Sequence, residues 1–322
     1  MQTDFLTLTQ DISLKETRAN FKDVPVWAKA NFWIGWIMLI SFVVITILCI
    51  VFTRESTLFY LAMVVYIWTG AYLILDAVHQ ANTTIRLRRF AAKNGFIFEH
   101  GQTIASDRPG TIFASGMARL FAALRTPSQY FFEIGNFQYI VNSGGTSNKF
   151  VYGFIRIKLP RRLPNLFLLS KRSGMPLPKT LQASQRLSLE GDFNKYFTVY
   201  APSGYEPDAL YILTPDIMQL FIEIAKDFTI EMVDDELYLY FKRKFNLTDP
   251  VTWHTYNQIL QKISTKFNRQ IDYYADDHVG DRSANIIAEL GRRLRTGWST
   301  CEIVFIGLIV ACVMFLLYRA SI

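Results

Sequence analysis

Three neighbouring stretches decide the fold of the soluble region: Arg186-Leu-Ser-Leu-Glu-Gly-Asp-Phe-Asn-Lys-Tyr-Phe-Thr-Val-Tyr200, Leu210-Tyr-Ile-Leu-Thr-Pro-Asp-Ile-Met-Gln-Leu-Phe-Ile222 and Phe228-Thr-Ile-Glu-Met-Val-Asp-Asp-Glu-Leu-Tyr-Leu-Tyr-Phe241. The first predicts two short strands, at 187–190 and 196–200. The second predicts a helix that Thr214 caps and Pro215 begins, with one apolar face. The third alternates around Asp234, Asp235 and Glu236, which predicts a hairpin with solvated acids at its tip. These elements predict an α+β domain with a mixed, mainly antiparallel sheet and flanking helices.

A spaced motif within these stretches suggests a family. It reads Leu189-Glu190-x-x-Phe193-x-x-x-Phe197-x-Val199-Tyr200, followed by Leu213-Thr214-Pro215 at the start of an amphipathic helix. This pattern resembles a bacterial family known only as a domain of unknown function, number thirty-one thirty-seven. The resemblance implies membrane helices joined to a cytoplasmic α+β domain. The family has no established activity, so the resemblance assigns no catalytic residue.

The upstream soluble region predicts further elements. Apolar residues of 110–124 recur at helical spacing, which predicts a helix before Pro127. Strands are expected at 130–141 and 150–159, joined by a turn at 143–148. Basic pairs at 161–162 and 171–172 flank another apolar run. These pairs fit two interpretations equally: contact with anionic headgroups, or the charged rim of an edge strand.

Three apolar runs dominate the rest of the chain, which has 322 residues of which 51% are hydrophobic. Runs at 31–52 and 57–78 each have about 20 residues, enough to cross a membrane as a helix. They predict a transmembrane helical hairpin over 31–78, because a helix satisfies its own backbone hydrogen bonds in lipid. A run at 302–318 predicts a third, C-terminal transmembrane helix. No signal-peptide pattern precedes the first run.

Basic residues cluster after the second run and before the third, whereas the hairpin turn holds only Arg54, beside Glu55. The flanking cations are Arg86, Arg88, Arg89, Lys93, Arg292, Arg293 and Arg295. The positive-inside rule then predicts a cell-membrane protein with a cytoplasmic N-terminus, a cytoplasmic soluble region and an outside C-terminus. The same seven residues are the expected contacts for anionic lipid. The net charge of +7 is therefore attributed to the membrane surface, and nucleic-acid binding is not expected.

Residues that could carry chemistry are sparse. All three cysteines, Cys49, Cys301 and Cys312, lie in or beside apolar runs, and the four histidines are scattered. No disulfide framework, metal-ligand spacing, phosphate loop or nucleophile motif is present. No cofactor, metal or catalytic residue is therefore predicted. A triad assembled only by folding stays open, because triads are defined by geometry.

The predicted organisation has five parts: a cytoplasmic arm at 1–30, a transmembrane hairpin at 31–78, an α+β domain at 86–248, a helical connector at 250–296 and a transmembrane helix at 302–318. We expect the α+β domain to serve as a scaffold that binds protein or lipid, with the bilayer and a protein partner or second copy as partners. The alternatives are a membrane-associated enzyme and, less favoured, a subunit of a transport complex.

Overall fold

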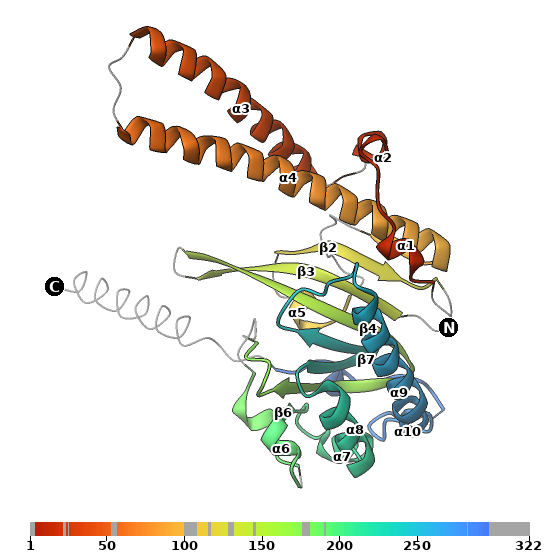
Figure 1. Cartoon of the computed structure of the whole chain (residues 1–322). Helices are drawn as coiled ribbons and strands as arrows, with labels where there is room; N and C mark the ends of the chain where they lie inside the picture. The colour runs from red at the N-terminus through yellow and green to blue at the C-terminus, as the bar shows by residue number, and fades with distance from the viewer. Residues whose placement is uncertain are drawn as a thin grey trace, which may run out of the picture. The chain divides into compact units, whose positions relative to one another are not determined.

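The computed structural model describes residues 4–21, 24, 26–52, 57–99, 108–114, 117–127, 132–143, 146–175, 181–189, 191–281 and 283–295 (Figure 1). The chain divides into two compact units. The first comprises 1–101 together with 246–253, and the second comprises 102–245 together with 254–322.

The first unit is built around two long helices, α3 (Val26–Phe52) and α4 (Thr57–Asn94). Segments Ala28–Ile47 and Leu61–Asn94 are long and apolar enough to cross a membrane. The second run continues into the basic segment as one helix, which stops before Gly95, whose φ is 69°. The strand β1 (Ile97–Glu99) follows. The predicted third span at 302–318 lies outside the described residues.

Close contact between α3 and α4 depends on Gly35 of α3, which lies against Gly70 of α4. A Cβ placed on Gly35 would lie 2.7 Å from the carbonyl oxygen of Gly70 and 2.7 Å from a side-chain carbon of Ile74. The hydroxyls of Ser41 and Tyr66 are 2.8 Å apart, which adds a hydrogen bond between the helices. Small residues that let two backbones approach are typical of helix pairs in membranes.

The N-terminal arm packs against the end of α4. It contains two short helices, α1 (Leu6–Thr9) and α2 (Leu14–Ala19). Asp4 and Asn94 exchange two hydrogen bonds, of 2.7 and 3.1 Å. The Thr17 hydroxyl donates to Asn82 at 2.8 Å, and the ring of Phe5 stacks on that of Phe90.

The second unit contains an antiparallel sheet with strand order β2-β3-β4-β6-β5, and β7 also pairs with β4. The strands are β2 (Met117–Arg125), β3 (Phe132–Ser143), β4 (Thr146–Ser170), β5 (Arg186–Leu187), β6 (Phe197–Tyr200) and β7 (Thr229–Phe241). The 25-residue β4 has partners on both sides, with β7 along one and β3 then β6 along the other. The α+β class and the predicted strands at 150–159 and 196–200 are confirmed, as is the strand at 130–141 over its described residues, but only Leu187 of the strand predicted at 187–190 lies in a strand. Arg161 and Arg162 lie within β4, between the positions Lys158 and Leu163 that pair with β7, and both interpretations of that pair stay predictions.

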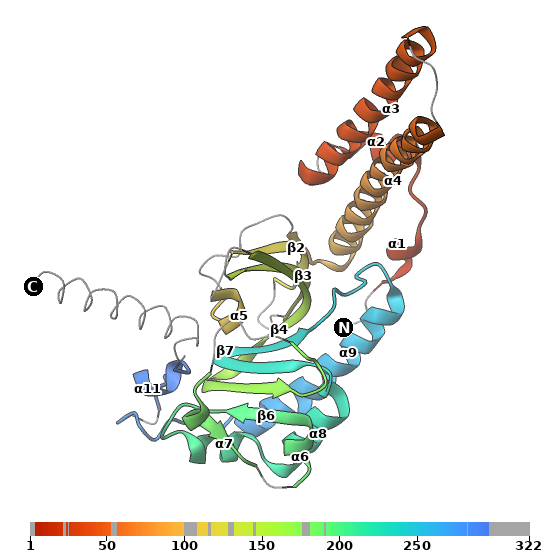
Figure 2. The same cartoon turned by 90° about the vertical axis from the view of Figure 1, so that its left-hand side faces the viewer.

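Short helices surround the sheet (Figure 2). They are α5 (Thr111–Ala114), a 3-10 turn (Ala183–Gln185), α6 (Phe193–Tyr196), α7 (Glu206–Ile212), α8 (Pro215–Ala225), α9 (Pro250–Lys262), a π-helical turn (Ile263–Phe267), α10 (Asn268–Ile271) and α11 (Glu289–Arg292). The helix that Pro215 begins is confirmed, although Thr214 makes no side-chain cap. Its apolar face is buried, and Phe221 contacts Phe267 with ring centroids 5.6 Å apart.

The predicted hairpin around residues 234–236 is wrong, because β7 is one continuous strand. Asp234 has φ 53°, and the register with β4 shifts at this residue. This irregularity resets the alternation, so Val233 joins the same core cluster as Tyr238 and Tyr240. The acids are therefore strand residues, and Glu236 is buried.

The predicted helix at 110–124 is also wrong. Only the four residues of α5 are helical, and 117–125 form β2. A register shift between Leu120 and Ala122 places an extra residue in the strand. Buried positions then fall at Leu120, Ala123 and Leu124, which imitates helical spacing.

Candidate functional site

A chain of buried charges crosses the centre of the sheet. Arg108 donates twice to Glu133, at 2.6 and 3.2 Å, and Arg156 donates to the same carboxylate at 3.3 Å. Arg156 also forms a two-point pair with Glu236, one bond of which is 2.9 Å long. Tyr238 donates to Glu236 as well. Two arginines and two glutamates thus alternate and carry no net charge.

Strand register brings these residues together. Glu133 lies opposite Arg156, and Arg156 lies opposite Tyr238. Their side chains therefore share the sheet face that also carries the aromatic core. Burial opposes the charge on Arg156, but the hydrogen bond and charge of Glu236 raise its pKa above the ordinary value. A closed and neutral network of this kind has a structural role, because no acid or base in it is left to react.

A second buried carboxylate anchors the segment before β2. Glu231 accepts from the backbone amide and the hydroxyl of Thr111, from Tyr240 at 2.9 Å and from Asn165 at 3.3 Å. Burial raises the pKa of Glu231, and these donors act in the opposite direction. The donors come from α5, β4 and β7, so Glu231 fixes the segment that covers the sheet.

Asp276 organises a third polar cluster. One carboxylate oxygen accepts from the amide and the ring Nδ1 of His278, at 2.9 and 3.0 Å. The other oxygen accepts from the Tyr205 hydroxyl and the Ala288 amide, both at 2.8 Å. Burial opposes ionisation, but these hydrogen bonds hold the pKa of Asp276 below its ordinary value. The cluster connects α7, the 276–278 turn and the residue before α11.

The Asp276 and His278 pair has the arrangement of an acid that orients a base. The His278 ring stacks on Tyr205 with centroids 4.3 Å apart and is 40% exposed. Among the described residues, no serine or cysteine is hydrogen-bonded to His278. In the described part of the chain no such nucleophile is hydrogen-bonded to the pair, and its contacts connect separate elements.

The predicted lipid-contact cations of α4 lie under the N-terminal arm. Arg89 pairs with Glu16, and Arg86 lies 4.0 Å from Asp11. Both arginine side chains are 32% exposed, whereas Lys93 is fully at the surface. Arg88 also interacts within the protein. The sequence did not indicate these intrachain partners, because the arm and α4 are far apart in the chain.

The C-terminal cations are more exposed. Arg292 pairs with Glu289 at 3.1 Å, and Arg293 pairs with Asp234 at 3.0 Å. Arg295 is exposed and forms no ion pair with the described residues. Contact of these seven residues with lipid stays a prediction.

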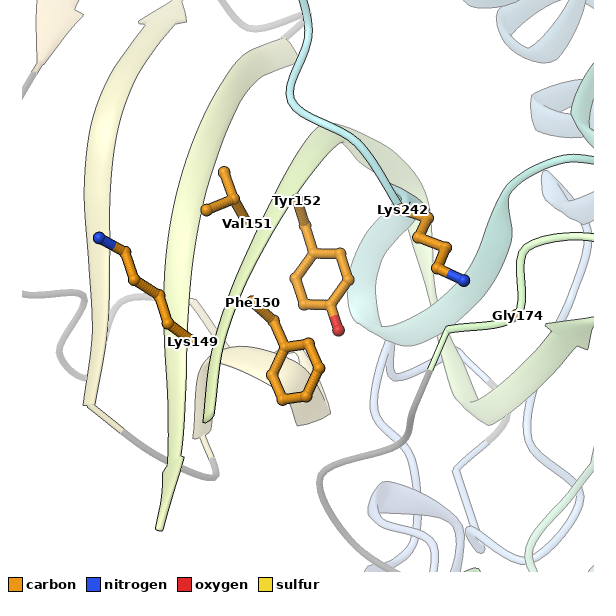
Figure 3. Close-up of a pocket in the computed structure, with 6 residues that line it drawn as sticks. All are labelled: Lys149, Phe150, Val151, Tyr152, Gly174 and Lys242. Atoms are coloured by element: carbon orange, nitrogen blue, oxygen red, sulfur yellow. The ribbon is translucent and has the colours of Figure 1, made fainter. Parts of the chain in front are cut away.

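A surface cavity of about 430 Å³ lies beside the start of β4, lined by Lys149, Phe150, Val151, Tyr152, Gly174 and Lys242. Figure 3 shows Phe150 and Tyr152 directed toward Lys242 and Gly174, whereas Lys149 is directed away. The cavity combines an aromatic wall with a cation. The described residues contain no group of three or more histidine, cysteine or acidic side chains that could hold a metal ion.

Comparisons with known proteins match part of the chain to a family, but they indicate no activity. Residues 154–278 match the model of a family described as "Protein of unknown function (DUF3137)". This confirms the resemblance over that segment. One solved structure is similar, the crystal structure of the mycobacterial trehalose monomycolate transport factor A, TtfA, with 9% identity, a TM-score of 0.36, and coverage of 57% of this chain and 91% of that chain. A likeness at this level carries no argument about function. No curated protein matches the chain.

Proposed function

We propose that this chain, whose residues 154–278 match the DUF3137 family, is a membrane-anchored interaction module. Helices α3 and α4 span a cell membrane as a hairpin, and the segment 302–318 crosses it again. The α+β domain lies on the cytoplasmic side, where it binds a protein partner, a second copy or lipid.

The observation that carries this proposal is the exposed apolar surface of α3 and α4. Only 6% and 11% of the residues in their most apolar windows are buried. Large side chains such as Trp33, Ile37 and Trp68 are exposed to at least 61%. An apolar helix in the core of a soluble protein would be mostly buried, so lipid is the environment that this surface fits.

A role in binding is favoured by the state of the buried polar groups. In the described part of the chain, the carboxylates of Glu133, Glu231, Glu236 and Asp276 are occupied by internal donors. An acid or base poised for catalysis would instead face a substrate cavity. The exposed cations Lys93 and Arg295 support lipid contact near the ends of the spans.

Cysteine labelling in intact cells tests the proposed topology. In a variant without Cys49, Cys301 and Cys312, the exposed Ser203 is changed to cysteine, or Ser56 between the two spans is changed instead. We expect a membrane-impermeant thiol reagent to label S56C in intact cells and S203C only after lysis. Labelling of S203C in sealed cells would overturn the cytoplasmic placement.

Crosslinking in cells tests the binding role. We expect the full chain, crosslinked and purified in mild detergent, to carry a stoichiometric protein, a second copy or anionic lipid by mass spectrometry. Purification without any of these would contradict an interaction module and favour the enzyme alternative.

A further inference from the structure

The cavity beside β4 has the size and composition of a small-molecule site. Its volume of about 430 Å³ lies within the range of roughly 300–1,000 Å³ that is usual for ligand pockets. Its walls come from three separate segments of the second unit: the start of β4, the loop after β4 and the residue that follows β7. The tertiary fold therefore brings these three segments together around the cavity.

One side of the cavity is aromatic. Phe150 and Tyr152 are two residues apart on β4, so they share a face, and their rings stack with centroids 6.2 Å apart and an interplanar angle of 12°. Tyr152 is buried in the aromatic core, and Phe150 is half-buried against it. Phe150 therefore presents a fixed apolar surface to the cavity.

The other side is cationic. Lys242 is exposed and begins the run Lys242-Arg243-Lys244, and none of the three forms an ion pair with the described residues. A Cβ on Gly174 would lie 3.0 Å from the Lys242 ammonium nitrogen. The absence of that carbon, at a residue with φ 52°, leaves the ammonium room at the cavity wall. Three cations without counter-charges create a positive field at this point.

We propose that this cavity binds an organic anion that has a phosphate or carboxylate head on an apolar body. Lys242 contacts the head, because an ammonium is a compact donor to such groups. The apolar body lies against Phe150, where stacking or apolar contact is available. The head belongs either to an anionic lipid or to a soluble metabolite, and the site itself does not depend on the membrane attachment proposed above.

Calorimetric titration of the full chain in nanodiscs of zwitterionic phosphatidylcholine tests the site. The probes are phenyl phosphate, which has both features, and inorganic phosphate, which has only the head. We expect one saturable site for phenyl phosphate and clearly weaker binding of inorganic phosphate. Lys242→Gln should weaken phenyl phosphate binding about tenfold, the effect of losing one charge-assisted hydrogen bond. Phe150→Ala should reduce the preference for phenyl phosphate over inorganic phosphate.

Lys266→Gln is the matched control, because it removes the same charge from an exposed side chain of the second unit that does not line the cavity. The affinity of this variant for phenyl phosphate should remain near that of the unchanged protein. Equal losses in K266Q and K242Q would reduce the effect to general surface charge and overturn the proposal, as would the lack of saturable binding. Nanodiscs with phosphatidylglycerol then identify the source of the head: weakened phenyl phosphate binding indicates a lipid, and unchanged binding indicates a soluble ligand.

Discussion

Arg156 is the residue on which the interior of the sheet depends most, because it contacts both Glu133 and Glu236. Arg156→Met should lower the free energy of unfolding by about 3–5 kcal/mol, since it leaves the buried carboxylate of Glu236 without its arginine partner, whereas Glu133 keeps Arg108. Denaturant unfolding followed by a signal from the second unit measures the change.

Arg172→Met is the matched control for that substitution. Arg172 pairs with Asp227 at 3.2 Å, but both side chains are about half exposed. Its loss should cost under about 1 kcal/mol. Equal effects of R156M and R172M would show that the buried network adds no stability.

Asp276 predicts a dependence of stability on pH. Its folded pKa lies below the ordinary 3.8, so its contribution is fully present above that value and is lost as pH falls through the folded pKa. Asp276→Asn keeps the size but has only one acceptor oxygen, so it cannot serve both the Tyr205 and Ala288 donors and the two donors of His278. The variant should be less stable at neutral pH and should lose less stability on acidification. An unchanged slope of unfolding free energy against pH would contradict this.

The sequence alone predicted few of the contacts within these buried polar clusters. Glu236 was assigned to a solvated tip, because three consecutive acids are usually exposed. Its partner Arg156 is 80 positions away. No local pattern connects residues at that distance, and only the strand register pairs them. The seven expected lipid contacts were predicted from charge alone. The internal partners of Arg86 and Arg89 were missed, because they are far away in the sequence.

At the scale of elements, the two helices of the hairpin should differ in their tolerance of a methyl group. A Cβ on Gly35 meets the backbone oxygen of Gly70 at 2.7 Å, which cannot move without the helix, whereas a Cβ on Gly70 has no neighbour nearer than 3.3 Å. Gly35→Ala should therefore separate α3 from α4, and Gly70→Ala should be tolerated. Crosslinking of S41C to Y66C by a short bismaleimide, whose spacer takes the place of the tyrosine ring, measures the separation in a background without native cysteines.

The Ser41 and Tyr66 hydroxyls are in contact in the unchanged hairpin, so the crosslink reports on the same interface. Its yield should fall in G35A and persist in G70A. Similar yields in the two variants would contradict close packing at Gly35.

Element prediction succeeded where the pattern was long or had a specific signal. The two apolar helices and the helix at Pro215 needed no tertiary information. It failed at β2 and β7, where a bulge or a left-handed residue breaks the alternation on which strand prediction depends. The sequence spacing at Leu120, Ala123 and Leu124 then resembled a helix, and residues 234–236 resembled a turn.

At the scale of the whole molecule, the α+β class followed from the sequence, because it depends on the kinds of elements and not on their partners. The N-terminal arm did not. The sequence predicted only an arm at 1–30 without internal partners being named, yet Leu8 is buried and Thr17 bonds to Asn82. The packing of Trp253 on Phe90 was equally invisible, because 163 positions separate the two residues, as 253 minus 90 gives. Long-range contacts of this kind leave no periodic pattern in the sequence from which they could be predicted.

The packing of the N-terminal arm against the end of α4 has a consequence for biosynthesis. Asp4 and Asn94 are 90 positions apart, so Asp4 finds its partner only after the whole of α4 has been synthesised. At translation rates of roughly 5–20 residues per second, the arm waits on the order of 5–18 seconds. During that interval the apolar hairpin emerges while Glu16 has not yet met Arg89. Closure of the arm therefore follows synthesis of both apolar helices, and the beginning of the chain is among the last parts of its unit to reach the native structure.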